Sequence, residues 1–278
     1  MERKVTDQIL FRRNRRRYQT LKSETDAFIR QYCKDATIKD GVFTVIDNYA
    51  RQNGIKAEVL RYPFYDNDLW AIAFIKEDTV FICINTDLEL CQQLFAAAHE
   101  LYHVICFVEK KDPQTLQNGS LLKRETVDEI GGDEEELEAN AFASMLLMPE
   151  DAAAEQMKLQ GIDQKQITLE SILMMMDTFA MPYKACVLRM LECGYIDEKE
   201  ALDLYDLDEA EIIKAILRIG KARIWVRNGQ GTESFGSLLD SFFHNAENEY
   251  LAPMREEEDR EYIESIIKEF HIDPEASI

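Results

Sequence analysis

Residues 88–107 carry an apolar stripe at helical spacing, and three ionisable side chains lie inside this pattern. They are His99, Glu100 and His103, in the order HExxH. Side chains at positions i and i+4 lie on one face of a helix, so the two imidazoles can reach a single ion. This spacing predicts a zinc site, with His99 and His103 as metal ligands.

Glu100 lies beside the two predicted ligands and is placed to act on a water rather than to bind the metal. Zinc lowers the pKa of water towards neutrality, and a neighbouring carboxylate can accept the proton as a general base. The alternative is that the histidines are ordinary residues of a buried helix. The chain holds only four histidines, so HExxH rarely arises by chance in such a sequence, and we favour the metal site.

Charge and cysteine content limit the classes of partner and compartment. The net charge of −21 disfavours direct DNA binding, because DNA affinity rests on neutralising phosphates. Arginines 12, 13, 15, 16 and 17 form a local basic cluster, and most such clusters are solvated or pair with acidic segments of the same chain. The six cysteines form no CxxC pair, no apolar run reaches the length of a membrane span, and the first residues lack the apolar core of a secretion signal. These features predict a cytoplasmic protein without a membrane segment.

The pattern of helix and strand signals predicts an α+β fold. An amphipathic helix over 42–52 precedes three β-rich runs at 57–62, 69–75 and 79–85, which we expect to form a small, mostly antiparallel three-stranded sheet packed on helices. The predicted domains are a helical and basic extension (1–40), a zinc metallopeptidase domain (41–160), a helix-turn-helix-like helical region (161–220) and a mostly helical C-terminal extension (221–278).

A tetrahedral catalytic zinc needs a third protein ligand. His244 and His271 are poor candidates, because one lies in an apolar–aromatic stretch and the other near the end of the chain. A second predicted helix begins in an acidic run and ends at Met148-Pro149. Its candidate ligands are Asp133, Glu134, Glu135, Glu136 and Glu138. Glu136 shares a stripe with Asn140, which could orient a ligand histidine, although spacing alone also fits a solvated acidic helix start.

Two segments together resemble the ImmA/IrrE metallopeptidase family. They are AAAHELYH at 96–103 and ELEANAFASMLLMPE at 136–150, and the resemblance extends over about residues 42–200. It implies a fold similar to the glutamate-zincins and one zinc ion per chain, held by His99, His103 and Glu136. It also implies that Glu100 is the general base and that Asn140 supports a ligand histidine from outside the metal shell.

The resemblance also raises two expectations about the substrate cleft. In zincin-like peptidases the substrate backbone lies along an exposed edge strand, which we expect here to be 69–75 or 79–85. The family usually has a small residue before the second histidine, where this chain has Tyr102. Its phenol could narrow the cleft or donate a hydrogen bond to an oxyanion.

Residues 167–196 resemble a helix-turn-helix, but their second helix offers only Lys184 and Arg189 as basic residues, so we interpret the segment as structural support or a docking surface. The function implied by the family resemblance is zinc-dependent, site-specific cleavage of a helix-turn-helix transcriptional repressor that controls a stress response, a phage or a mobile element. The alternative is a zinc-containing binding or sensor module that regulates its partner without proteolysis. Direct DNA regulation is the least favoured hypothesis.

Overall fold

A computed structural model describes residues 5–34, 38, 41–109, 114–124, 126, 134–221, 225 and 233–270. The strands within these ranges are β1 (Lys56–Tyr62), β2 (Leu69–Lys76), β3 (Thr79–Asn85), β4 (Ser120–Lys123) and β5 (Ser234–Phe235). The helices are η1 (Val5–Asp7), α1 (Leu10–Arg13), α2 (Arg15–Tyr32), α3 (Val42–Asn53), α4 (Leu90–Val108), α5 (Gln114–Asn118), α7 (Glu134–Leu147), α8 (Glu150–Leu159), α9 (Leu169–Phe179), α10 (Tyr183–Glu192), α11 (Glu198–Tyr205), α12 (Glu209–Arg218), α14 (Leu238–Glu247) and α15 (Pro253–Phe270). The predicted α+β class is confirmed.

The sheet is larger than predicted and is mixed. Its strand order is β4-β2-β3-β1-β5. β2 and β3 form the expected antiparallel pair, whereas β1 runs parallel to β3, with Lys56 opposite Thr79 and Tyr62 opposite Asn85. The prediction of three mostly antiparallel strands was therefore wrong. β2 pairs with β3 on one side and with β4 on the other, and β1 pairs with the far side of β3.

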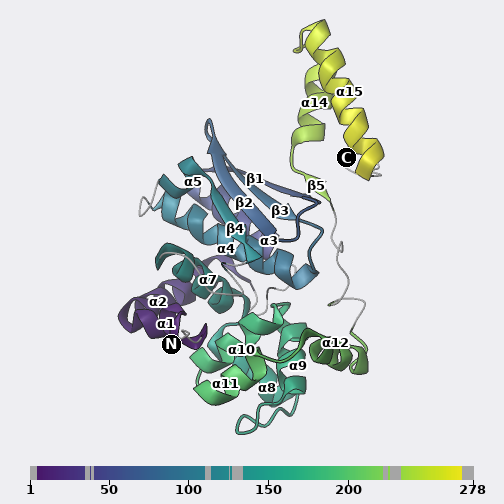
Figure 1. The fold of residues 1–278 in the computed structure, drawn as a ribbon. Helices are drawn as coiled ribbons and strands as arrows, with labels where there is room; N and C mark the ends of the chain where they lie inside the picture. The colour runs from purple at the N-terminus through teal and green to yellow at the C-terminus, as the bar shows by residue number, and fades with distance from the viewer. Residues whose placement is uncertain are drawn as a thin grey trace.

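Helices α3 and α4 support the sheet and fix the position of the HExxH segment. The apolar face of α3 is buried through Val45, Ile46 and Tyr49, and the helix ends at Gly54, whose left-handed conformation (φ 65°) favours glycine. At the start of α4, the side chain of Gln92 accepts a hydrogen bond from the Glu89 backbone amide at 3.1 Å. Figure 1 shows α4 passing between the sheet and α7.

The N-terminal helices pack against the helix that carries the acidic run. α2 lies along α7, and the rings of Phe28 and Phe142 meet edge to face with centroids 5.5 Å apart. α9 and α10 follow in the order of a helix-turn-helix, with Ala180 in a left-handed conformation between them. Figure 1 shows α14 and α15 side by side at the end of the described chain, beyond the β5 edge of the sheet.

Some sequence predictions concern parts of the chain that the structure does not describe. Asp133 and His271 lie outside the described residues. Between α4 and α7, where the sequence analysis placed no element, the described residues form α5 and β4. Among the described helices, none combines the length and apolarity that a membrane crossing requires.

Candidate metal centre

The HExxH residues lie in the middle of α4 and are buried. His99 and Glu100 are fully inaccessible and His103 is 1% exposed. Burial of three ionisable groups in one helical turn is costly unless they are paired or bind a metal. Burial of the apolar residues around them on α4, among them Ala97 and Leu101, stabilises the packing of this helix on the sheet and on α7 and offsets this cost.

The Nε2 atoms of the two histidines face each other and a carboxylate from α7. They lie 3.2 Å apart, while Glu136 Oε2 is 3.3 Å from His99 Nε2 and Glu136 Oε1 is 3.5 Å from His103 Nε2. The potential ligand atoms of these three residues all lie within 4.8 Å of one another. Of the acidic candidates that the structure describes on α7, Glu136 is therefore the one that completes a group of three.

Both histidines are oriented through their other ring nitrogen. His99 Nδ1 lies 3.0 Å from Asn140 Oδ1, and the amide of Asn140 donates to the Thr126 carbonyl at 3.1 Å. His103 Nδ1 lies 2.9 Å from Glu135 Oε1. Because both partners accept, each Nδ1 carries the proton and each Nε2 presents its lone pair.

The resulting donor set is suited to a cation. Two imidazole lone pairs and a carboxylate converge, yet neutral histidines of this tautomer bring no proton to the space between them. Such a cluster of acceptors repels itself unless a proton or a metal ion lies at its centre. Two imidazole nitrogens and one carboxylate also match the ligand set of catalytic zinc sites that leave a position open. The residues present therefore fit a zinc ion.

The pKa shifts reflect this concentration of charge. Burial lowers the pKa of His103, but the hydrogen bond to Glu135 and the charges of Glu100 and Glu136 outweigh burial, so the net shift is upward. Burial raises the pKa of Glu136, and the two histidines reverse that effect, so its pKa lies below the usual value. Both shifts follow from negative charge that the histidines must balance.

Glu100 differs from the other carboxylates of the centre. Burial raises its pKa, against the opposing influence of His103, His99 and the nearby Ser120 hydroxyl. Neither of its oxygens meets the geometry of a hydrogen bond to any described residue. A buried carboxylate with this freedom and a raised pKa can accept and release a proton, which a metal ligand or a paired carboxylate does less readily.

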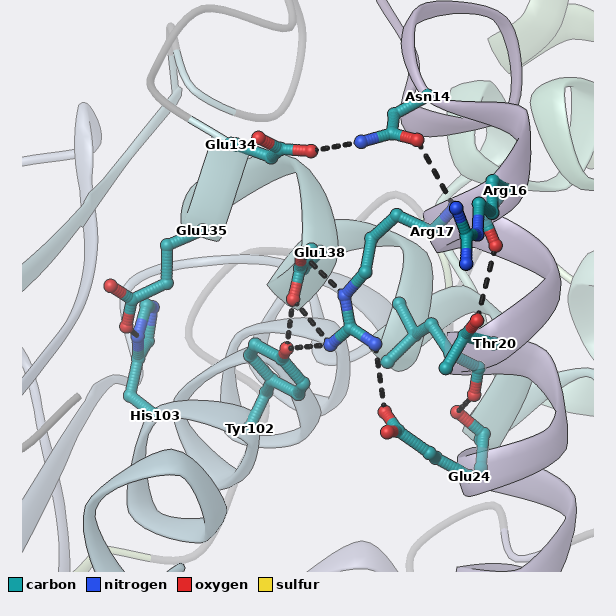
Figure 2. Close-up of polar contacts among 12 residues, drawn as sticks. Asn14, Arg16, Arg17, Thr20, Glu24, Tyr102, His103, Glu134, Glu135 and Glu138 are labelled. Atoms are coloured by element: carbon teal, nitrogen blue, oxygen red, sulfur yellow. Dashed lines mark hydrogen bonds and ion pairs between the residues drawn. The ribbon is translucent and has the colours of Figure 1, made fainter. Parts of the chain in front are cut away.

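Tyr102, whose phenol could narrow the cleft or donate to an oxyanion, has hydrogen-bond partners on α7 and α2 in this structure. Its hydroxyl donates to Glu138 and lies 3.1 Å from Arg17 Nη2, on the flank of α7 shown in Figure 2. Because the single phenolic proton is committed to Glu138, the contact observed for Tyr102 is structural. The basic cluster is likewise not uniformly solvated, since Arg17 is partly buried between Glu138 and Glu24.

Sequence reasoning missed two supporting groups, Glu135 and the Thr126 carbonyl. Glu135 precedes Glu136 and was among the acidic candidates, but only the structure shows that it contacts His103 rather than the ion site.

The other histidine and the basic residue considered in the sequence analysis lie away from the metal centre. His244 is on α14, where its carbonyl accepts from Asn248, and the Arg189 side chain is buried, donating to the Met148 carbonyl, so it is not exposed to DNA.

An HExxH helix packed against a mixed sheet, with a glutamate from a second helix facing both histidines, defines a peptidase of the zincin-like class. Residues 53–190 match the family model of the IrrE N-terminal-like domain, Peptidase_M78, so this part of the chain is a domain of the ImmA/IrrE family. No curated protein sequence matches the chain. The family match includes α4 and α7 but not α1 and α2.

Proposed function

We propose that the protein is a zinc-dependent endopeptidase that cleaves a helix-turn-helix transcriptional repressor at a defined site. The observation that carries the catalytic part of this proposal is the buried carboxylate of Glu100, which forms no hydrogen bond of normal geometry to a described residue and lies next to the His99–His103–Glu136 group. A purely structural zinc site has no need of a buried acid beside its ligands, whereas amide hydrolysis needs a general base.

His99, His103 and Glu136 would hold the zinc ion, which, when bound, supplies a Lewis acid and lowers the pKa of water. Glu100 takes a proton from the attacking water and returns it to the leaving amine, so one carboxylate serves both halves of the hydrolysis. Asn140 and Glu135 keep the imidazole Nε2 atoms directed inward throughout. No redox partner or organic cofactor is required.

The sheet offers an edge for an extended substrate. Among the described residues, β4 lies at the edge next to β2, so the earlier expectation of β2 or β3 as the edge strand was wrong. Leu121 on β4 is 53% exposed, and its neighbour Ser120 lies close enough to Glu100 to influence its pKa. Addition of a substrate segment to β4 would therefore bring a peptide backbone near the proposed base.

The choice of a repressor as substrate rests on the resemblance to the ImmA/IrrE family. The net charge of −21 and the burial of Arg189 disfavour direct DNA binding as the route to regulation. Cleavage of a repressor would instead relieve repression by destroying the DNA-binding protein. We propose this action in the cytoplasm, where such repressors work.

The experiment is incubation of the zinc-loaded protein with repressors encoded near its own gene, followed by mass spectrometry of the fragments. We expect one defined cut, and Glu100→Gln should lower its rate by about 10²–10⁴-fold while zinc content is unchanged. Glu155→Gln, an exposed change on α8 of the same chemistry, is the matched control and should cleave normally.

Two outcomes would contradict the proposal. Absence of cleavage with all candidate repressors would remove the proposed substrate class. Full biological activity of Glu100→Gln, combined with loss of activity in His99→Ala, would instead favour the alternative of a zinc-containing binding or sensor module.

A further inference from the structure

We propose that Arg17, on a helix outside the family match, is a positioning residue that fixes the rotation of α7 and thereby holds Glu136 at the metal site. The inference rests on the zinc site of the proposed function. It concerns a different part of the molecule, because α2 contributes no atom to the predicted metal shell.

The Arg17 side chain links three helices through one guanidinium group. Its Nε and Nη2 atoms each lie 2.7 Å from an oxygen of Glu138, which makes the pair bidentate. Nη2 also lies 3.1 Å from the Tyr102 hydroxyl on α4, and Nη1 lies 3.0 Å from Glu24 on α2 itself. Figure 2 shows the guanidinium between Glu138, Tyr102 and Glu24, so α2, α4 and α7 meet at this group.

The position of Glu138 on α7 explains why this contact matters for Glu136. Residues advance by about 100° around a helix, so Glu136 and Glu138 lie about 160° apart across the face that contains Ala139. Ala139 is fully buried, and α7 packs on α4. Glu136 thus extends from one flank of the contact to the histidines, and Glu138 from the other flank to Tyr102 and Arg17. Rotation of α7 about its axis cannot move one carboxylate without moving the other.

Repulsion between carboxylates on α7 favours rotation of this helix if the Arg17 side chain is lost. Glutamates 134, 135, 136 and 138 lie within little more than one turn, and like charges at these spacings repel. Glu138 is only 14% exposed, so without the guanidinium its charge would be held near Tyr102 with little solvent. Rotation towards water would relieve that cost and would withdraw Glu136 from His99 and His103.

The burial of Arg17 distinguishes it from the rest of the basic cluster. The hydrogen bond to Glu138 raises the pKa of Arg17 above its usual value in spite of partial burial. Arg16, in contrast, is exposed, and the guanidinium of exposed Arg12 lies 3.6 Å from the carboxylate of Glu198. α2 is also held by buried Tyr18, Leu21 and Phe28, so loss of the Arg17 side chain should leave the helix in place.

The test compares Arg17→Ala with Arg16→Ala, which removes the same side chain one residue away. Zinc affinity is measured by competition with a chromophoric chelator, and ligand geometry by the visible spectrum of the cobalt-substituted protein. We expect Arg17→Ala to weaken zinc binding by about 10-fold or more and to alter the cobalt spectrum, as loss of outer support for metal ligands does. Arg16→Ala should stay within about twofold of wild type.

Arg17→Lys provides the conservative variant. Lysine keeps the charge but cannot bond both oxygens of Glu138 and the Tyr102 hydroxyl in one plane, so we expect an affinity between those of wild type and Arg17→Ala. A residue that merely stabilises the fold would lower the thermal midpoint without changing the zinc affinity of the folded protein. If Arg17→Ala does not fold, Tyr102→Phe and Glu138→Gln test the same contacts.

Hydrogen–deuterium exchange of the metal-free protein gives a second readout. Amides of α7 should exchange faster in Arg17→Ala than in Arg16→Ala, because α7 has lost its anchor on one flank. Failure of the wild-type protein to bind zinc would overturn the proposed function. The exchange rates of the α7 amides would then still show whether the contact of Arg17 with Glu138 holds α7 in place. Equal zinc affinity in the two alanine variants, or equal exchange of α7, would overturn the inference.

Discussion

Asn140→Ala is the change for which the structure gives the most definite expectation. The Asn140 side chain accepts from His99 Nδ1 at 3.0 Å and donates to the Thr126 carbonyl at 3.1 Å. Alanine removes both contacts but leaves His99, His103 and Glu136 in the chain. The variant therefore tests whether orientation of an imidazole, rather than its presence, sets metal affinity.

Two magnitudes follow from these contacts. Outer partners of metal ligands are worth about 10–100-fold in affinity, which corresponds to about 1.4–2.7 kcal/mol at 1.36 kcal/mol per tenfold. In the metal-free protein the variant loses only hydrogen bonds, each worth about 0.5–1.5 kcal/mol of folding free energy. We therefore expect a weakened zinc site in a protein that remains folded.

The assay is zinc competition at constant pH, together with urea unfolding of the metal-free protein. Asn140→Asp is the informative control, because a carboxylate still accepts from His99 but no longer donates to Thr126. Its affinity should remain above that of Asn140→Ala, since carboxylates commonly support zinc-bound histidines. Zinc affinity of Asn140→Ala equal to wild type would refute the role assigned to Asn140.

Three further predictions concern the same framework. Glu136→Gln should weaken zinc binding more than Asn140→Ala, because it replaces a charged ligand rather than an outer contact, and equal losses in a chelator competition would contradict this ranking. Arg189→Ala should lower the free energy of unfolding by about 3–5 kcal/mol in urea titrations, because it leaves the buried carboxylate of Glu192 without its cationic partner at 3.1 Å, and a loss under about 1 kcal/mol would count against it. The pKa of His103 is raised on folding, so its contribution to the stability of the metal-free protein is present below its unfolded pKa of 6.5 and is lost as pH rises through the higher folded pKa. Urea unfolding between pH 6 and 9 should therefore show a decline that His103→Gln removes, and an unchanged slope in that variant would exclude His103 as its source.

Local sequence signals predicted the helices and the first three strands well. α3 follows its i, i+3, i+4 pattern to the residue before Gly54, and β1, β2 and β3 lie within one residue of their predicted bounds. Hydrophobic period and turn chemistry determine these elements over a few residues, so the sequence contains the required information.

Strand pairing was not predictable in the same way. β4 has only four residues within a polar connection, and β5 has two, so neither carries a pattern long enough to identify a strand. β1 pairs in parallel with β3 while β4 pairs with the outer edge of β2, so the strand order rests on contacts between segments distant in the chain. Short connections normally favour antiparallel neighbours, and that expectation failed here.

For the candidate site, spacing identified His99, Glu100 and His103, whereas the choice of Glu136 and Asn140 also needed the family resemblance, and neither showed all the contacts. His99, Glu100 and His103 stood out in one helical turn, and the stripe shared by Glu136 and Asn140 favoured the glutamate that the structure places beside the histidines. The contact of Glu135 with His103 and the link from Arg17 to Glu138 depend on how α2, α4 and α7 pack. Neither contact could be predicted from the sequence, because no local pattern links side chains that are 32 residues apart, as in the first pair, or 121 residues apart, as in the second.

Anomalous diffraction at the zinc edge from crystals of the zinc-loaded protein would test the central claim most directly. We predict a single strong peak for a zinc ion within bonding distance of the Nε2 atoms of His99 and His103 and of the carboxylate of Glu136, with Glu100 not bonded to the ion. A zinc ion bonded to other residues, or bonded to the histidines through their Nδ1 atoms, would contradict this assignment of the metal ligands.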